Sequence, residues 1–66
     1  MENIQYIATV YTDNGYYYLG PDNFANVKNQ LIDDLSEIDV IKGYIYEFND
    51  DTSMPDGDPV GLYLNK

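Results

Sequence analysis

The stretch PDNFANVKNQLIDDLSEI, residues 21–38, decides the fold. Its apolar residues recur every three or four positions, which predicts an amphipathic helix with Ile32 at the edge of the apolar stripe. The stripe consists of Phe24, Val27, Leu31, Leu35 and Ile38. A proline followed by an aspartate that could cap free amides, Pro21 and Asp22, indicates the start of the helix. Because β-branched residues then begin, we expect the helix to end near residues 37–39.

Four segments around this helix have the composition of strands. Residues 4–12, IQYIATVYT, alternate between two faces, and residues 16–19 form a second strand. Asp13-Asn14-Gly15 lies between them, and Asn-Gly is typical of a type I′ hairpin turn. After the helix, residues 40–48, VIKGYIYEF, predict a third strand, and residues 60–64, VGLYL, predict a short fourth one.

Two hairpins on either side of one helix predict an α+β fold of the type ββαββ. We expect a four-stranded antiparallel sheet with the helix packed on one face, because both elements have an apolar side to bury. Residues 1–66 form a single domain, since no linker or repeat interrupts the pattern. A chain this small buries only about 60% of its unfolded surface, and without Cys or His it has neither disulfides nor thiolate or imidazole zinc sites. Oligomerisation is one remaining way to gain stability, and we expect a homodimer.

The chain is strongly acidic, with twelve Asp and Glu against three Lys, no Arg and a net charge of −9. Such a charge repels nucleic acid and anionic membranes and attracts basic proteins. No run of apolar residues is long enough for a membrane span, and the N-terminal residues MENIQYIATV lack the basic region of a signal peptide. We therefore expect a cytoplasmic protein that binds a basic partner and contacts neither nucleic acid nor membrane.

No residues form a recognisable catalytic or cofactor-binding set. Ser36 and Ser53 have no His to act as a base, and no Cys is available as a nucleophile. No glycine-rich phosphate loop and no basic patch are present. The sequence therefore predicts a protein that is not an enzyme and that has no cofactor.

The stretch FNDDTSMPDGDPVG, residues 48–61, resembles a metal loop in its composition alone. A calcium-binding EF-hand needs acids at positions 1, 3 and 5, glycine at 6 and glutamate at 12. If Gly57 takes position 6, Thr52 and Met54 occupy acidic positions and Tyr63 occupies the glutamate position. An irregular carboxylate site for a cation and a hairpin connection rich in turn-forming residues are the remaining interpretations. The spacing favours the hairpin, and we expect no metal.

Eight tyrosines are the second unusual feature: Tyr6, Tyr11, Tyr16, Tyr17, Tyr18, Tyr44, Tyr46 and Tyr63. Because strand residues alternate between faces, the helix can cover only some of them, and the others lie on the open face of the sheet. Tyrosine suits strands in general, but it is also enriched in protein interfaces. We predict an interface formed by Tyr17, Tyr44 and Tyr46.

Several acids occupy positions where they do not help folding. Negative charge at the C-terminal end of a helix opposes the helix dipole and costs some tenths of a kcal/mol for each acid. Side chains four residues apart on a helix rise about 6 Å, and DNA advances about 3.4 Å per phosphate, so rows of carboxylates can imitate phosphates coarsely. We expect the helix end and the acidic loop to form one such surface. Its predicted partner-binding residues are Asp33, Asp34, Glu37, Asp39, Asp50, Asp51, Asp56 and Asp58.

In its size, its charge, its lack of Arg, His and Cys and its mixed β/α pattern, the chain resembles the small acidic DNA-mimic inhibitors of bacteriophages. These proteins share no sequence motif. The resemblance implies a non-enzymatic inhibitor in the host cytoplasm that blocks the DNA-binding surface of a basic host protein, with nucleoid-associated HU-type proteins as the favoured target. The alternative is a small oligomeric structural or assembly module that uses a tyrosine-rich sheet face.

Overall fold

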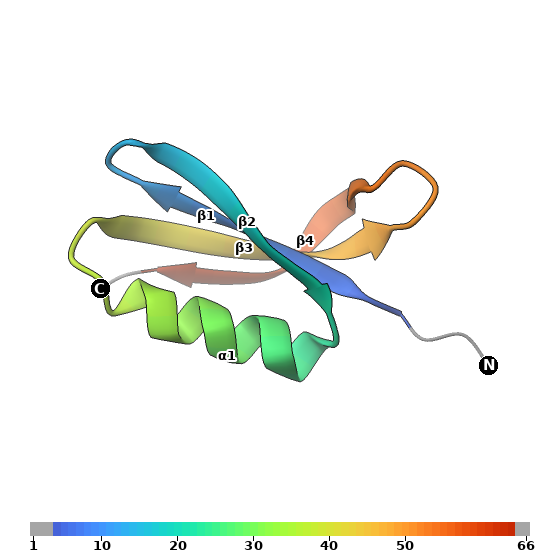
Figure 1. The fold of residues 1–66 in the computed structure, drawn as a ribbon, viewed down its shortest axis with the longest axis horizontal. Helices are drawn as coiled ribbons and strands as arrows, with labels where there is room; N and C mark the ends of the chain where they lie inside the picture. The colour runs from blue at the N-terminus through green and yellow to red at the C-terminus, as the bar shows by residue number, and fades with distance from the viewer. Residues whose placement is uncertain (1–3, 65–66) are drawn as a thin grey trace.

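The computed structural model describes residues 4–64, and for Asp56 it describes the backbone alone. Five elements follow one another along the chain (Figure 1): β1 (Tyr6–Thr12), β2 (Gly15–Asp22), α1 (Phe24–Leu35), β3 (Val40–Asn49) and β4 (Met54–Leu64). The strands form one antiparallel sheet in the order β2-β1-β3-β4. The helix packs on one face of the curled sheet. The predicted α+β fold of the type ββαββ is therefore confirmed.

The core lies between α1 and the inner strands. Val27 and Leu31 from the helix are fully buried against Val10 and Ile45 from the sheet. Gly43 lies beneath the helix, where an added Cβ atom would overlap Cδ1 of Leu31. The missing side chain therefore lets the helix approach the sheet at this point.

The helix is shorter than its apolar pattern predicts. Asn23 is the N-cap, and its side-chain oxygen accepts a hydrogen bond of 2.8 Å from the backbone N–H of Asn26. The preceding residues, Pro21 and Asp22, still belong to β2. The helix ends at Leu35, so Ile38 falls in the following turn and is 99% exposed. The prediction that Ile38 belongs to the buried stripe was wrong, because the stripe continues only as long as the helix does.

A two-residue loop, Asp13 and Asn14, joins β1 to β2, with Thr12 paired to Gly15. The backbone N–H of Asn14 donates to the hydroxyl of Thr12 over 3.1 Å. In the described part of the chain, Ser53 is the one residue other than glycine with a positive φ, so Asn14 does not adopt the type I′ geometry. The hairpin was predicted correctly, but its turn type was not.

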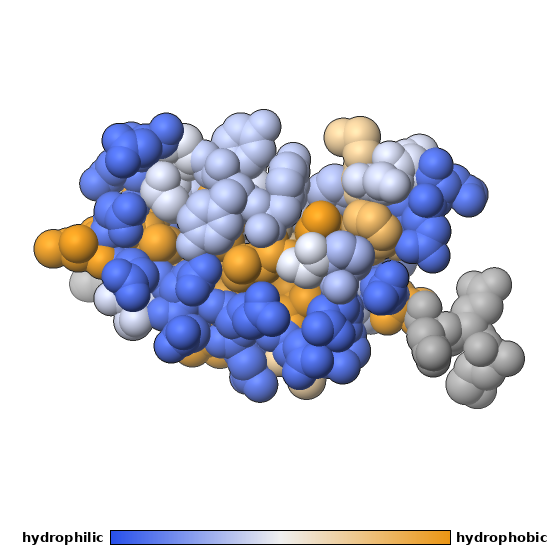
Figure 2. Space-filling model, in the orientation of Figure 1, coloured by the Kyte–Doolittle hydropathy of each residue, from blue (hydrophilic) through white to orange (hydrophobic). Residues whose placement is uncertain are grey.

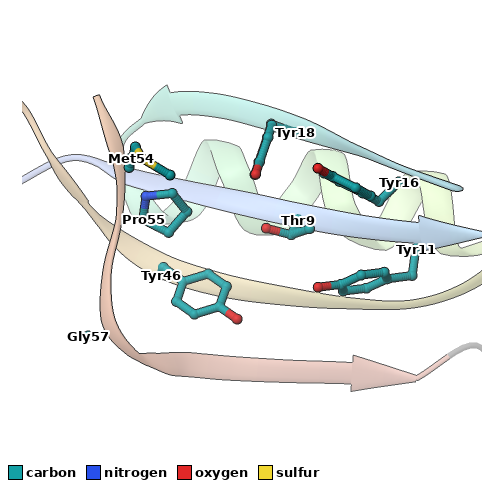
Figure 3. A pocket seen from close by; sticks show the side chains of 8 residues that line it. All are labelled: Thr9, Tyr11, Tyr16, Tyr18, Tyr46, Met54, Pro55 and Gly57. Atoms are coloured by element: carbon teal, nitrogen blue, oxygen red, sulfur yellow. The ribbon is translucent and has the colours of Figure 1, made fainter. Parts of the chain in front are cut away.

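The fourth strand begins six residues earlier than predicted, at Met54 instead of Val60. Its first part pairs Pro55 with Phe48, and its last part pairs Gly61 with Ile45. Between these parts the register shifts, and Gly57 has a φ of 69° that favours glycine. The strand bends sharply near Gly57 (Figure 3). The acidic stretch is thus mostly a bent strand, and only residues 50–53 connect β3 to β4.

The molecule is elongated, measuring 39 × 20 × 16 Å along its principal axes. The turn between β1 and β2 and the connection from α1 to β3 lie together at one end, while the connection from β3 to β4 lies at the other (Figure 1). Within residues 4–64, no helix has the length and apolar character needed to cross a membrane.

Candidate functional site

The face of the sheet away from the helix holds a cluster of five tyrosines. The register pairs Tyr18 with Thr9, Tyr16 with Tyr11, and Tyr44 with Thr9, which places these side chains opposite to the core residues. Neighbouring ring centroids are 5.7–6.3 Å apart, within the usual range for aromatic pairs. The contacts run without interruption from β2 across β1 to β3. We call this set the tyrosine cluster: Tyr11, Tyr16, Tyr18, Tyr44 and Tyr46.

The chain places one of its own cations on the tyrosine cluster. The Nζ atom of Lys42 lies 5.4 Å from the ring centroid of Tyr11 and 5.4 Å from that of Tyr44. An ammonium within about 6 Å of an aromatic face is attracted by the ring quadrupole. This face therefore already holds a positive charge between two rings.

A groove of about 490 Å³ runs beside the cluster. Its lining comes from all four strands (Figure 3): Thr9, Tyr11, Tyr16, Tyr18, Tyr46, Met54, Pro55 and Gly57. Thr9 is only 5% exposed and lies on the middle strand of this view. The hydroxyl ends of Tyr11, Tyr16 and Tyr18 point toward the middle of the groove. The bend of β4 encloses one end of it with Met54 and Pro55. The groove thus combines aromatic walls with several hydroxyl groups.

The predicted interface residues do not share one face. Tyr44 and Tyr46 belong to the tyrosine cluster, whereas Tyr17 pairs with Val10 and lies on the helix side of the sheet. Its hydroxyl donates a hydrogen bond of 2.7 Å to Oδ2 of Asp34. Desolvation, followed by this bond and the charges of nearby acids, raises the pKa of Tyr17 to about 12. The grouping of Tyr17 with the other two was wrong, because its neighbours Tyr16 and Tyr18 occupy the open face instead.

The acids in the last turn of α1 and in the connection to β3 gather at one end of the molecule, which we call the helix end: Asp33, Asp34, Glu37 and Asp39. After desolvation and the bond to Asp34, the charges of Asp34, Asp39 and Glu37 also raise the pKa of Tyr17, so these carboxylates lie on its side of the molecule. The backbone N–H of Asp13 donates to the carbonyl of Asp39 over 3.1 Å, which joins the β1–β2 turn to the same end. These predicted partner-binding residues are therefore close together in space.

The remaining predicted acids lie elsewhere. Asp50 and Asp51 are exposed in the β3–β4 connection, at the opposite extreme of the long axis (Figure 1). Asp58 is exposed on β4, where its charge contributes to the raised pKa of Tyr46 after desolvation and the nearby tyrosines. The side chain of Asp56 lies outside the described part of the structure. We call Asp50 and Asp51 the hairpin end; Asp58 lies outside it, near Tyr46.

The two acidic groups therefore do not form the one continuous surface that the sequence suggested. Figure 2 shows hydrophilic residues along α1 and at both ends of the molecule, with a paler band over β2. The exposed side of α1 between the ends carries neutral amides such as Asn29 and Gln30. Six of the predicted acids instead lie at the two ends, while Asp22, Glu47 and Asp58 belong to the strands. Among the described side chains, no group of three or more acids is arranged to hold a metal ion.

The groove residues of β1 and β2 were not predicted as a site, although strand alternation contains the signal. Thr9 and Tyr11 alternate with the buried Ala8 and Val10, so they belong to the open face. The contribution of Met54 and Pro55 depends on the bend of β4, which the sequence pattern did not reveal. No protein-family model, curated protein or solved structure matches the chain. The function must therefore be argued from these surfaces.

Proposed function

We propose that this protein is a non-enzymatic DNA mimic that binds and blocks the nucleic-acid-binding surface of a basic protein. The arrangement that supports the proposal most is the presence of grouped carboxylates at both ends of an elongated molecule, the helix end and the hairpin end. A partner with two separate cationic patches could meet one acidic end with each patch.

The net charge of the chain is lower than that of a DNA duplex of the same length, which favours contacts at the two acidic ends over contacts along the whole molecule. A duplex as long as the 39 Å axis of the molecule carries about 23 phosphate charges, against a net charge of −9 for the chain. One chain therefore has roughly two fifths of the charge density of the duplex it would replace. Because the average is lower, competition depends on the places where several carboxylates lie together.

The position of the helix-end acids is consistent with a use in binding. Asp33 and Asp34 occupy the last turn of α1, and that turn has no basic residue. Negative charge there opposes the helix dipole, and although Asp34 accepts the hydrogen bond from Tyr17, Asp33 has no such structural use among the contacts described above. Opposite charges on a partner would compensate for this effect when the two proteins associate.

Binding of this kind is competitive and sensitive to salt. Lys and Arg residues of the partner that normally contact phosphates would instead contact carboxylates, and long-range attraction would speed association. Among possible targets, nucleoid-associated HU-type proteins remain the favoured class because of the resemblance to phage-encoded inhibitors. The site of action would be the host cytoplasm.

A second candidate function is supported by the apolar part of the open face. Val60, Leu62 and Leu64 on β4 are each more than half exposed. Exposed apolar surface of this kind is typical of interaction sites. An oligomeric structural or assembly module, in the simplest case a homodimer, would cover these residues with a second copy.

A pull-down from a bacterial lysate distinguishes the two candidates. The immobilised protein should capture basic DNA-binding proteins at low salt and release them at high salt, because screening weakens the attraction. Failure to capture any such protein, together with a stable oligomer in a sizing experiment, would support the module instead.

Matched variants locate the binding surface. Asp33→Asn with Asp39→Asn neutralises the helix end, and Asp50→Asn with Asp51→Asn neutralises the hairpin end. The control, Asn29→Lys with Gln30→Lys, changes the net charge by the same two units on the exposed middle of α1. Each end variant should capture less partner than the control does. If the control loses as much binding as the end variants, net charge alone is responsible and the proposed contact regions are wrong.

A further inference from the structure

We propose that the groove on the open face binds a cationic side chain, an Arg or Lys from a basic segment of the partner, and holds it against the tyrosine rings. This inference rests on the proposed function, because it assigns an anchoring site for the same partner. The occupant follows from the shape of the groove, the chemistry of its lining and the charge around it.

The groove has the dimensions of a ligand site. Its volume of about 490 Å³ falls within the range of roughly 300–1,000 Å³ that is usual for such pockets. Tyr16 and Tyr18 form one side and Tyr11 and Tyr46 the other, with Thr9 between them (Figure 3). A long, flexible side chain could lie along the groove with its aliphatic part near Met54 and Pro55.

The lining provides what a cation needs. Aromatic faces attract ammonium and guanidinium groups, and clusters of aromatic rings recognise such ligands in other proteins. Lys42 demonstrates this on the same face, because its Nζ atom lies 5.4 Å from two rings of the tyrosine cluster. The phenol oxygens of Tyr11, Tyr16 and Tyr18 point toward the middle of the groove and can accept hydrogen bonds from the N–H groups of the cation.

The electrostatic surroundings select against other occupants. Asp58 lies close enough to Tyr46 to raise the pKa of its phenol, after desolvation and the neighbouring tyrosines. An anionic ligand would be repelled by this carboxylate and by the net charge of −9. A second copy of the chain would bring another −9, whereas a basic segment would neutralise part of the charge. Charge complementarity therefore identifies the occupant as a basic segment.

An NMR titration tests the groove directly on the full chain. The probes are a short peptide with two arginines and the same peptide with citrulline, which keeps the shape of arginine but lacks its charge. The ring signals of Tyr16, Tyr18 and Tyr46 and the methyl signal of Met54 should shift with the arginine peptide and stay in place with the citrulline peptide. Equal shifts with both peptides, or shifts confined to the two acidic ends, would overturn the inference.

A pair of variants measures the contribution of one ring. Tyr18→Leu removes a groove ring that is 48% exposed, and it should weaken binding of the arginine peptide roughly two- to fivefold. Tyr63→Leu makes the same substitution on the helix side of the sheet and should leave binding unchanged. Equal affinity of the Tyr18→Leu variant and the parent would contradict a cation held on this ring.

The groove and the proposed function can fail separately. If the protein captures a DNA-binding partner equally well with and without the ring of Tyr18, the groove inference fails and the proposed function stands. If the arginine peptide shifts the groove signals but no DNA-binding protein is captured, the groove inference stands and the proposed function fails.

Discussion

Gly43 is the position where a single methyl group should disturb the core most. In Gly43→Ala, the added Cβ would overlap Cδ1 of Leu31 and lie 3.1 Å from its Cδ2 and 3.2 Å from its Cγ. Leu31 cannot retreat, because it is fully buried, as are its core neighbours Val10 and Ile45. The substitution therefore forces the helix and the sheet apart or moves Leu31 out of its preferred rotamer.

The expected cost is large for a chain of this size. Overpacking of a core costs about 1–3 kcal/mol, and the reduced freedom of the unfolded chain returns about 0.4–1 kcal/mol when Gly is replaced by Ala. Gly43→Ala should therefore lower the free energy of unfolding by about 1–2 kcal/mol. For 66 residues the whole free energy of unfolding is roughly 3–10 kcal/mol.

Urea unfolding followed by circular dichroism measures this change. With an m-value of about 1 kcal/mol per M, the midpoint should fall by about 1–2 M without a change in m. Gly61→Ala is the control: its added Cβ would come no closer than 3.0 Å to a ring carbon of the half-buried Tyr63, whereas the Cβ at Gly43 would overlap a fully buried side chain, so the midpoint should shift much less.

A double-mutant cycle isolates the contact between the two residues. Leu31→Val removes both δ carbons, so Gly43→Ala should cost much less in that background. If Gly43→Ala lowers the midpoint equally in both backgrounds, or not at all in either, the close approach of Leu31 to Gly43 does not limit the packing of the helix.

The two remaining predictions concern one hydrogen bond and one helix cap. The pKa of Tyr17 is raised to about 12, so the folded state keeps the phenol proton longer than the unfolded state does, and stability should decline as the pH rises from about 10 to about 12. In the Tyr17→Phe variant, the free energy of unfolding should no longer fall by this amount between about pH 10 and pH 12. An absorbance titration of the phenolates should also lose its last step. If the titration is unchanged, another tyrosine ionises last and the reasoning is wrong. Asn23→Ala removes the acceptor for the N–H of Asn26 and should lower the free energy of unfolding, measured with urea, by about 1 kcal/mol. Asn23→Asp keeps an acceptor oxygen and should retain most of the stability. Equal losses in both variants would show that the cap does not act through this bond.

Most of the fold could be predicted because the residues of each helix or strand show the pattern typical of that element. Strand alternation identified β1 and β3, and the apolar spacing of residues 24–35 identified α1. The predicted helix was too long at both ends: Pro21 and Asp22 belong to β2, and Ile38 continues the apolar spacing after the backbone has left the helix. The beginning of β4 was missed because Pro55 and Gly57 are residues that usually interrupt strands.

The surfaces depend on arrangements that local patterns do not contain. The face of the sheet on which Tyr17 lies could have been predicted from the two-residue loop, because this loop pairs Thr12 with Gly15 and hence Val10 with Tyr17. The separation of the two acidic ends could not have been predicted in this way, because it depends on the sheet order β2-β1-β3-β4. The groove likewise requires the bend at Gly57, where several residues of β4 lie opposite Tyr46 alone.

The central claim is that the protein competes with DNA for the same surface of a basic partner. The most direct measurement is the fluorescence anisotropy of a labelled DNA duplex bound to a purified HU-type protein, with this protein added at increasing concentration. We expect that DNA is released and that more protein is needed for release as the salt concentration rises. The variant that combines Asp33→Asn, Asp39→Asn, Asp50→Asn and Asp51→Asn should release little DNA. If a complex with the HU-type protein forms while the DNA stays bound, or if the neutralised variant releases DNA as well as the parent does, the account is contradicted.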